Sequence, residues 1–192
     1  MKRSAFTLIE VLVAATLSVG LIGIAGSAYI QSQRLTAAQA DELTVAQNAR
    51  VLVDRISRDV RQTTEFTATL PEAVGDGIST IQFVDGHEPS GGPYYLEYAL
   101  EGGQVWRRKL YYYRPSQPDV RVTFNPTETI YEEGDSVPGD ALVRHQEENI
   151  AIADGVDNLS FWGTASLLRI DVWLSDGGSD IYQLHSAVAK RN

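Results

Sequence analysis

Carboxylates in two loops are the side chains of this sequence best suited to binding a metal ion. One loop holds Glu132, Glu133, Asp135 and Asp140, and the other holds Asp176 and Asp180. Carboxylate oxygens are the ligands that Ca²⁺ requires, but neither spacing matches an EF-hand loop. A solvated acidic loop explains the same residues, so we expect no metal and no cofactor. The calcium candidates that test this expectation are Asp135, Asp140, Asp176 and Asp180.

Histidine and cysteine give no sign of catalysis. His87, His145 and His185 stand in different segments, and none belongs to a two-histidine helical motif. The sequence contains no Gly-x-Ser-x-Gly elbow. It has no cysteine either, which excludes a disulfide scaffold and a thiolate metal site. We therefore expect a protein that is not an enzyme.

Another carboxylate, Glu10, is the only charged residue in the apolar stretch from Phe6 to Ile30. At about 1.5 Å per residue, a helix of this length crosses a bilayer core of roughly 30 Å. Lys2 and Arg3 place its start in the cytoplasm, so the bulk of the chain is expected outside the inner membrane. A carboxylate inside a membrane costs on the order of 2 kcal/mol or more, which argues for a partner. A signal peptide cut near residues 26–28, or a plain anchor, is the alternative.

The sequence from Ser4 to Ala14, SAFTLIEVLVA, resembles the type III signal of type IV pilins and type II secretion pseudopilins. The resemblance implies that a prepilin peptidase cuts between Ala5 and Phe6 and methylates the new amine of Phe6. Ala5 stands where this family usually has glycine. The resemblance also implies that Glu10 is an assembly residue, which pairs with the N-terminus of a neighbouring subunit.

The C-terminal region carries a second similarity. The segment from Asp154 to Phe161, a final hairpin and the terminal Arg191-Asn192 look like PilW-type minor pilins and J-type pseudopilins. This implies a structural subunit that primes or caps a type IV pilus or a type II secretion pseudopilus. Its partners would be other pilins, bound through the N-terminal helix, the prepilin peptidase and the inner-membrane assembly platform. The subunit would cross the inner membrane once, with its C-terminal domain in the periplasm or outside, and then join the filament.

Two other classes of function remain open at this point: a membrane-anchored extracytoplasmic binding domain and an exported enzyme. The charge balance bears on the choice of partner. The chain has 16 basic and 25 acidic residues, a net charge of −9, and loss of Lys2 and Arg3 with the leader makes it −11. Such a chain is poorly suited to polyanions, because nucleic-acid binding depends on clustered Lys and Arg. We expect the membrane, but no nucleic acid, among its partners.

One long helix is predicted from the apolar stretch onward, since neither proline nor glycine occurs between Gly26 and Pro71. Its second half carries one apolar face with the spacing of an amphipathic helix. This face consists of Ala49, Val53, Ile56 and Val60, and the residues expected off it are Arg50, Asp54, Arg58, Asp59 and Arg61. We predict a leader (1–5), a membrane-spanning helix (6–30), an amphipathic helix (31–65) and a β-rich head domain (66–192).

Beyond the helix the apolar period changes to two, which indicates strands. Two hairpins are predicted: Tyr94–Leu100 with Val105–Tyr113, and Leu168–Leu174 with Ile181–Ala189. Shorter strands are expected at Ile78–Val84, Val120–Phe124, Leu142–His145, Ile150–Ala153 and Val156–Trp162, with a loop over Asn125–Asp140. A helix followed only by strands predicts an α+β fold in which the long helix packs on an antiparallel sheet. The resemblance implies that this fold is pilin-like.

Tyrosine is concentrated in the first hairpin, as Tyr94-Tyr95 and Tyr111-Tyr112-Tyr113. These runs would suit an adhesive or subunit-binding surface, since tyrosine is enriched in interfaces. In an alternating strand, aromatic residues more often fill the core on one face and act as β formers on the other. We favour the second interpretation.

Overall fold

A computed structural model describes residues 7–67, 69–87, 92–175 and 181–190. The chain divides into two units, Met1–Thr44 and Val45–Asn192. The main helix, α1, covers Leu8–Gln62 and so belongs to both. Its continuity over 55 residues confirms that the apolar stretch and the amphipathic stretch form one helix.

In the first unit, α1 contains a segment long and apolar enough to cross a membrane, Leu8–Thr36, with a mean hydropathy of 2.3. None of this segment is buried within the protein. Its exposed side chains include Ile9, Val11, Leu12 and Leu17, which point in different directions around the helix. A helix that is apolar all round requires lipid or partner helices around it.

In the second unit, the remaining part of α1 buries one face. Ala49, Leu52, Ile56 and Val60 are completely buried there, and Val53 is nearly so. The helix ends at Gln62, and the hydroxyl of Thr63 donates a hydrogen bond of 2.7 Å to the carbonyl of Val84. This bond ties the end of the helix to the sheet that it covers.

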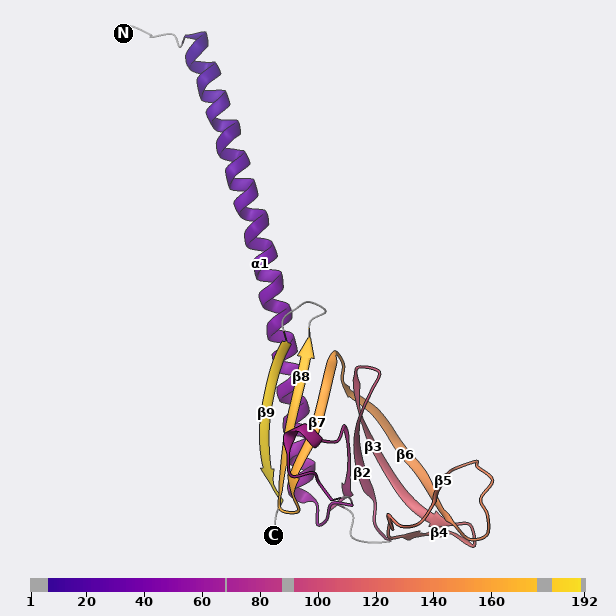
Figure 1. Cartoon of the computed structure of the whole chain (residues 1–192). Coiled ribbons are helices and arrows are strands. Elements are labelled where there is room, and N and C mark those ends of the chain that lie inside the picture. Colours follow the sequence, from indigo (N-terminus) through magenta and orange to yellow (C-terminus); the bar gives the residue numbers. More distant parts are fainter. Residues whose placement is uncertain (1–6, 68, 88–91, 176–180, 191–192) are drawn as a thin grey trace. The chain divides into compact units, whose positions relative to one another are not determined.

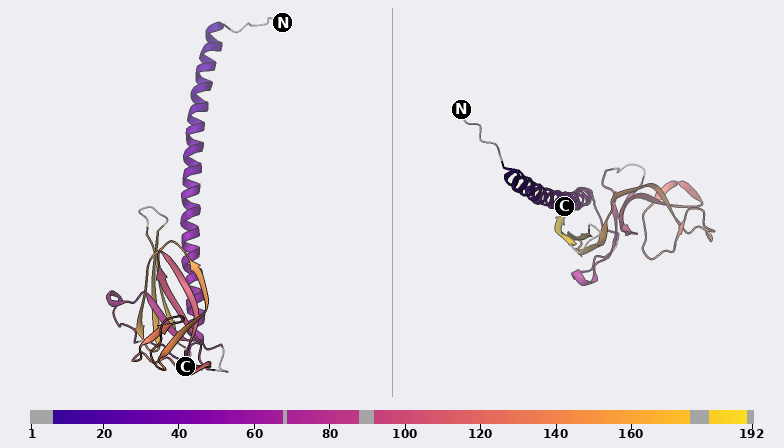
Figure 2. Two further views of the ribbon diagram at one scale, coloured as in Figure 1. Left: turned by 90° about the vertical axis from the view of Figure 1, so that its right-hand side faces the viewer. Right: turned by 90° about the horizontal axis from the view of Figure 1, so that it is seen from above.

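The larger sheet has six strands in the order β1-β2-β3-β6-β5, and β4 pairs with β3. Its strands are β1 (Thr80–Val84), β2 (Tyr95–Glu101), β3 (Gln104–Arg114), β4 (Gln117–Val122), β5 (Ile130–Glu132) and β6 (Leu142–Ala153). The smaller sheet has the order β7-β8-β9, with β7 at Val156–Thr164, β8 at Leu167–Ser175 and β9 at Ile181–Ala189. Figures 1 and 2 show the smaller sheet beside the C-terminal part of α1.

Both predicted hairpins are present, as β2–β3 and β8–β9, and the α+β fold class is confirmed. Two details differ from the prediction. Residues 142–153 form the single strand β6, although its centre is polar, because β3 pairs with it along most of its length. The predicted loop 125–140 contains β5, which runs parallel to β6.

Two apolar cores hold the second unit together. The first lies between α1 and both sheets, and includes Ile56, Phe83, Tyr98, Phe161 and Ile170. The second is made by Tyr95, Leu110, Tyr112 and Leu142, with side chains from residues 122–130 packed against it. Residues 122–130, from the end of β4 to the start of β5, therefore supply most of the partly buried side chains that close the second core, and Val84 of β1 supplies another.

The prediction that Asp59 lies off the buried face of α1 is wrong. Its side chain is only 6% exposed, and it accepts hydrogen bonds from the hydroxyl of Tyr98 (2.6 Å) and from Nε of Arg107 (2.9 Å). Both partners come from the larger sheet. A strip of apolar residues read from sequence cannot reveal a buried carboxylate whose partners come from distant strands.

Candidate functional site

The predicted assembly carboxylate, Glu10, lies in the first turn of α1 and is hydrogen-bonded to Thr7. Its Oε2 atom accepts bonds from the backbone N–H of Thr7 (2.9 Å) and from the Thr7 hydroxyl (3.0 Å). The backbone N–H of Glu10 in turn donates to Oγ1 of Thr7 (3.4 Å). These reciprocal bonds form a capping box, the arrangement that a Thr-x-x-Glu sequence favours at a helix start.

Glu10 thus has a second, local role as the cap of its own helix, which was not predicted from the sequence. The signal was available, since Thr7 precedes Glu10 by three residues at the start of a helical pattern. Ala5 and Phe6, where the resemblance implies cleavage and methylation, lie outside the described residues. The arrangement of Thr7 and Glu10 can begin a helix and hold a carboxylate in a fixed orientation at its start.

Two of the calcium candidates fall in the described part of the chain, and each carboxylate bonds to nearby backbone. Oδ2 of Asp135 accepts the N–H of Glu132 (3.0 Å), and Oδ1 of Asp140 accepts the N–H of Ser116 (3.0 Å). The bond from Ser116 lowers the pKa of Asp140 below its usual range. Asp176 and Asp180 lie outside the described residues.

The other two acidic residues of this loop contact basic side chains. Glu132 lies 3.2 Å from Arg144, and Glu133 lies 2.6 Å from Nδ1 of His145. Among the described residues, no three His, Cys, Asp or Glu side chains converge as a metal ion would require. The structure therefore spreads these carboxylates over separate turn bonds and ion pairs.

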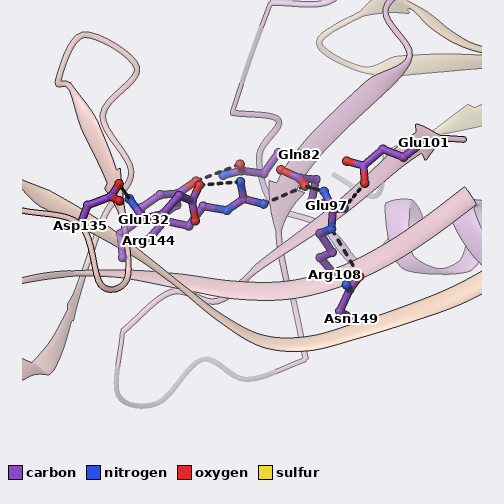
Figure 3. Close-up of polar contacts among 9 residues, drawn as sticks. Gln82, Glu97, Glu101, Arg108, Glu132, Asp135, Arg144 and Asn149 are labelled. Atoms are coloured by element: carbon purple, nitrogen blue, oxygen red, sulfur yellow. Dashed lines mark hydrogen bonds and ion pairs between the residues drawn. The ribbon is translucent and has the colours of Figure 1, made fainter.

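A larger set of charged side chains surrounds Glu97 on the larger sheet (Figure 3). Oε1 of Glu97 accepts a hydrogen bond from Nη1 of Arg108 (3.0 Å) and another from Nη2 of Arg144 (2.8 Å). The Glu97 side chain is 9% exposed. Each arginine also forms an ion pair with a second carboxylate: Arg108 with Glu101, and Arg144 with Glu132. The network links β2, β3, β6 and β5, so its evident role is to fix their pairing.

The network has no sequence signature, because its members are brought together only by strand register. Glu97 pairs with Arg108 across β2 and β3, and Glu132 pairs with Arg144 across β5 and β6. A buried carboxylate between two guanidinium groups is already compensated for its burial. It offers neither a free base nor a nucleophile.

The tyrosine runs are divided between the faces of the larger sheet. Tyr95 and Tyr112 are buried in the second core, with ring centroids 5.3 Å apart. Tyr94 is also buried, 4% exposed, and the guanidinium of Arg121 lies 3.7 Å from its ring centroid. Tyr111 packs against His145 at 4.7 Å. Most of this aromatic area is used within the fold, which agrees with the structural interpretation of the runs.

Each histidine lies beside one carboxylate. Nδ1 of His87 is 2.7 Å from Asp85, and Nδ1 of His185 is 2.7 Å from Asp171. These pairs belong to different parts of the second unit, and the pair of His145 with Glu133 belongs to a third. The described histidines do not converge on one site.

The sequence matches no protein-family model and shows no significant similarity to a curated protein. The architecture itself is informative. A long apolar N-terminal helix followed by antiparallel β-sheets is consistent with a pilin-like protein.

Proposed function

We propose that this protein is a minor pilin or pseudopilin, a structural subunit that primes or caps assembly of a type IV pilus or a type II secretion pseudopilus. The observation that carries the proposal is the position of Glu10 at the start of an exposed apolar helix that leads to a β-sheet unit with its own core. Its partners would be other pilins, the prepilin peptidase and the assembly platform of the inner membrane. We propose no catalytic role.

The physical basis lies in the first turn of α1. Cleavage before Phe6 would create a positive amine four residues, about 6 Å of helix rise, ahead of Glu10. In a filament core that excludes water, an isolated carboxylate would cost several kcal/mol. The amine of a neighbouring subunit would offset this cost. The charge pair would fix the axial register between subunits, while the apolar surface of Leu8–Thr36 supplies most of the attraction.

The capping box stabilises the Glu10 carboxylate before assembly. Thr7 already gives Glu10 two donors in the isolated chain, which lowers the cost of carrying the carboxylate before assembly. A carboxylate has room for about four hydrogen bonds, and Oε2 accepts both of those from Thr7. The remaining capacity of Glu10 is available to a neighbouring amine.

Mass spectrometry of the mature N-terminus tests the proposal against its rivals. We expect a chain that begins with N-methylated Phe6 when it is isolated from cells with active prepilin peptidase. A membrane-anchored binding domain or an exported enzyme would not need this modification. A chain that begins at Tyr29, or that stays uncut in such cells, would exclude the proposed function.

A second test addresses assembly. Glu10→Ala should leave membrane insertion and cleavage intact but block incorporation into the filament or its priming complex. Because few copies would be needed, loss of the protein should reduce the number of filaments more than their length. Normal filament counts together with normal co-purification of the variant with partner pilins would contradict the assembly role.

A further inference from the structure

Strand β9 lies at the edge of the smaller sheet, and β8 is its neighbour on one side. Within the described residues no strand pairs with its other side. It is nine residues long and pairs with β8 from end to end without a bulge. Its sequence, IYQLHSAVA, contains no proline, lysine or carboxylate. Proteins usually protect exposed edges with such residues or with bulges, so an unprotected regular edge is a site at which another strand adds.

The opposite edge of the same sheet is different. β7 has a register shift between Val156 and Asn158, and Ile78 pairs with Phe161 through backbone hydrogen bonds of 2.8 and 3.1 Å. That edge is thus irregular and already partly occupied. The contrast makes β9 the open side of the smaller sheet (Figure 1).

The backbone groups that face the open edge can be identified. The N–H of Lys190 donates to the carbonyl of Ser166 (3.0 Å), which makes this a hydrogen-bonded pair in the antiparallel register of β8 and β9. Since such pairs alternate along a regular ladder, Ser186 and Val188 also bond to β8. The N–H and C=O groups of Gln183, His185 and Ala187 therefore point to the open edge.

The side chains beside that edge are held rigidly. Asp171 is 3% exposed although it lies between Arg169 and Trp173 on the outer face of β8. Its Oδ2 accepts the indole N–H of Trp162 (2.6 Å), and its Oδ1 contacts Nδ1 of His185 (2.7 Å). This carboxylate fixes two rings on the outer face of the sheet.

A hollow of about 450 Å³ adjoins these rings, and its lining includes Arg169, His185 and Ala187. Ala187 lies directly opposite Arg169 in the strand register, and both side chains are exposed and line this hollow. Arg169 lies 4.5 Å over the ring of Trp162, and no described carboxylate pairs with it. A carboxylate carried on a strand next to β9 would find its hydrogen-bond donors here.

A second cationic group lies near the end of the same strand. Arg58 and Arg61, from the last turns of α1, line a hollow of about 420 Å³ together with Ala189 at the end of β9. Within the described residues neither arginine forms an ion pair. The open edge thus has unpaired guanidinium groups near it in a protein whose net charge is −9.

From these two observations, the unprotected edge and the cations beside it, we infer that β9 binds an extended acidic segment of a second protein by strand addition. Backbone hydrogen bonds to Gln183, His185 and Ala187 would supply the pairing, and an acidic side chain opposite Ala187 would reach Arg169. This surface lies wholly in the second unit. The inference holds whether or not the protein enters a filament.

The test uses the full-length chain in detergent micelles and a labelled peptide with the same length as β9. The peptide alternates threonine and valine and has aspartate as its third residue, which lies opposite Ala187 when the peptide pairs antiparallel with β9 from end to end; a second peptide has lysine there. We expect fluorescence anisotropy to show binding of the aspartate peptide at least tenfold tighter than the lysine peptide. Arg169→Glu should reverse this preference. Equal affinity for both peptides, in the original chain and in the variant, would overturn the inference.

Ala187→Pro tests the edge itself. Proline is tolerated where the N–H faces away from the sheet, so this variant should keep its melting temperature and yet lose at least tenfold in peptide affinity.

Hydrogen exchange tests strand addition without a mutation. The bound peptide should newly protect the amides of Gln183, His185 and Ala187, whereas those of Ser186 and Val188 are already protected without it. Unchanged exchange at saturating peptide would refute strand addition. A dimer that forms without peptide and is lost in Ala187→Pro would show that β9 instead pairs with a second copy.

Discussion

The hydroxyl of Tyr98 donates a hydrogen bond of 2.6 Å to the buried carboxylate of Asp59, which joins β2 to the helix that covers it. Burial, followed by the nearby Asp59 carboxylate, raises the pKa of Tyr98 well above its ordinary value. The tyrosine therefore stays protonated and keeps its donor. Arg107 supplies the positive charge that compensates Asp59 at 2.9 Å. This triad fixes the rotation of α1 on the sheet, because Asp59 faces the sheet alongside the apolar residues.

We expect Asp59→Ala to destabilise the second unit by about 3–5 kcal/mol, since it removes the buried partner of Tyr98 and Arg107 and leaves Arg107 only its longer contact with Glu148 (3.4 Å). Tyr98→Phe should cost less, about 1–3 kcal/mol, because Asp59 keeps its bond to Arg107. Denaturant unfolding followed by tryptophan fluorescence measures both changes in the free energy of unfolding, because Trp106, Trp162 and Trp173 all lie in the second unit.

Asp54→Ala provides the matched control for this prediction. Asp54 lies on the same helix but is exposed, so its removal should change the free energy of unfolding by no more than about 0.5 kcal/mol. If Asp59→Ala were as mild as Asp54→Ala, the triad would not anchor the helix.

Asp59 also shows where sequence reasoning stops. The apolar spacing of Ala49, Val53, Ile56 and Val60 correctly predicted a buried helical face. A polar residue on that face is tolerated only when partners exist, and the partners of Asp59 stand 39 and 48 positions away in the chain. The same limit applies to Glu97, whose two arginines are placed by strand pairing. Local periodicity contains no information about either.

The strands show the same division between local and distant causes. The hairpins β2–β3 and β8–β9 were predictable because each has alternating apolar residues on both sides of a polar, glycine-containing turn. By contrast β5, only Ile130–Glu132, forms because residues 142–144 of β6 lie parallel to it. In the candidate assembly site, the Thr7–Glu10 bonds followed a local pattern and could have been predicted.

Alkaline pH should destabilise the second unit through Tyr112. Burial raises the pKa of Tyr112 to about 12, from an ordinary value of about 10. Between these pH values the unfolded chain loses the phenolic proton while the folded chain retains it, so stability falls as the pH rises. The loss should be about 1.4 kcal/mol per pH unit across this interval.

Unfolding curves measured from pH 9 to pH 12 test this prediction, and Tyr112→Phe should flatten the pH dependence. Some slope should remain in the variant, because burial also raises the pKa of Tyr95 and of Tyr98. Tyr29→Phe serves as the control, since Tyr29 lies in the first unit and is exposed. An identical slope in the Tyr112→Phe protein and the original would show that this phenol does not ionise on unfolding.

The second unit should fold without the apolar part of α1. A fragment from Val45 to Asn192 retains all the residues of α1 that the structure describes as buried, from Ala49 to Val60, together with both sheets. We expect it to be soluble, monomeric and cooperative in thermal unfolding, as judged by light scattering and circular dichroism. A fragment that begins at Ser57 lacks Leu52, Val53 and Ile56, and should fail to fold because the first core loses its helical side. Aggregation of the longer fragment, or equal stability of the two, would contradict the prediction.

The two roles of Glu10, helix cap and charge, are separable by substitution. In Glu10→Gln the amide oxygen still accepts the bonds from Thr7, because glutamine also forms capping boxes, but the negative charge is lost. In Thr7→Val the hydroxyl is lost and the charge remains, at a cost of about 1 kcal/mol to the helix start. If the charge binds the amine of a neighbouring subunit, Glu10→Gln should insert and be cleaved normally but lose at least about tenfold in incorporation. Thr7→Val should assemble nearly as the original does.

Quantitative co-purification with partner pilins, together with filament counts, measures both variants in the same cells. The opposite behaviour of the two variants would contradict the prediction. If Thr7→Val fails to assemble while Glu10→Gln succeeds, the carboxylate acts through the first turn of α1 and not through a neighbour's amine. The charge pair would then be excluded as the device that sets subunit register, and the exposed apolar surface of Leu8–Thr36 would have to set it alone.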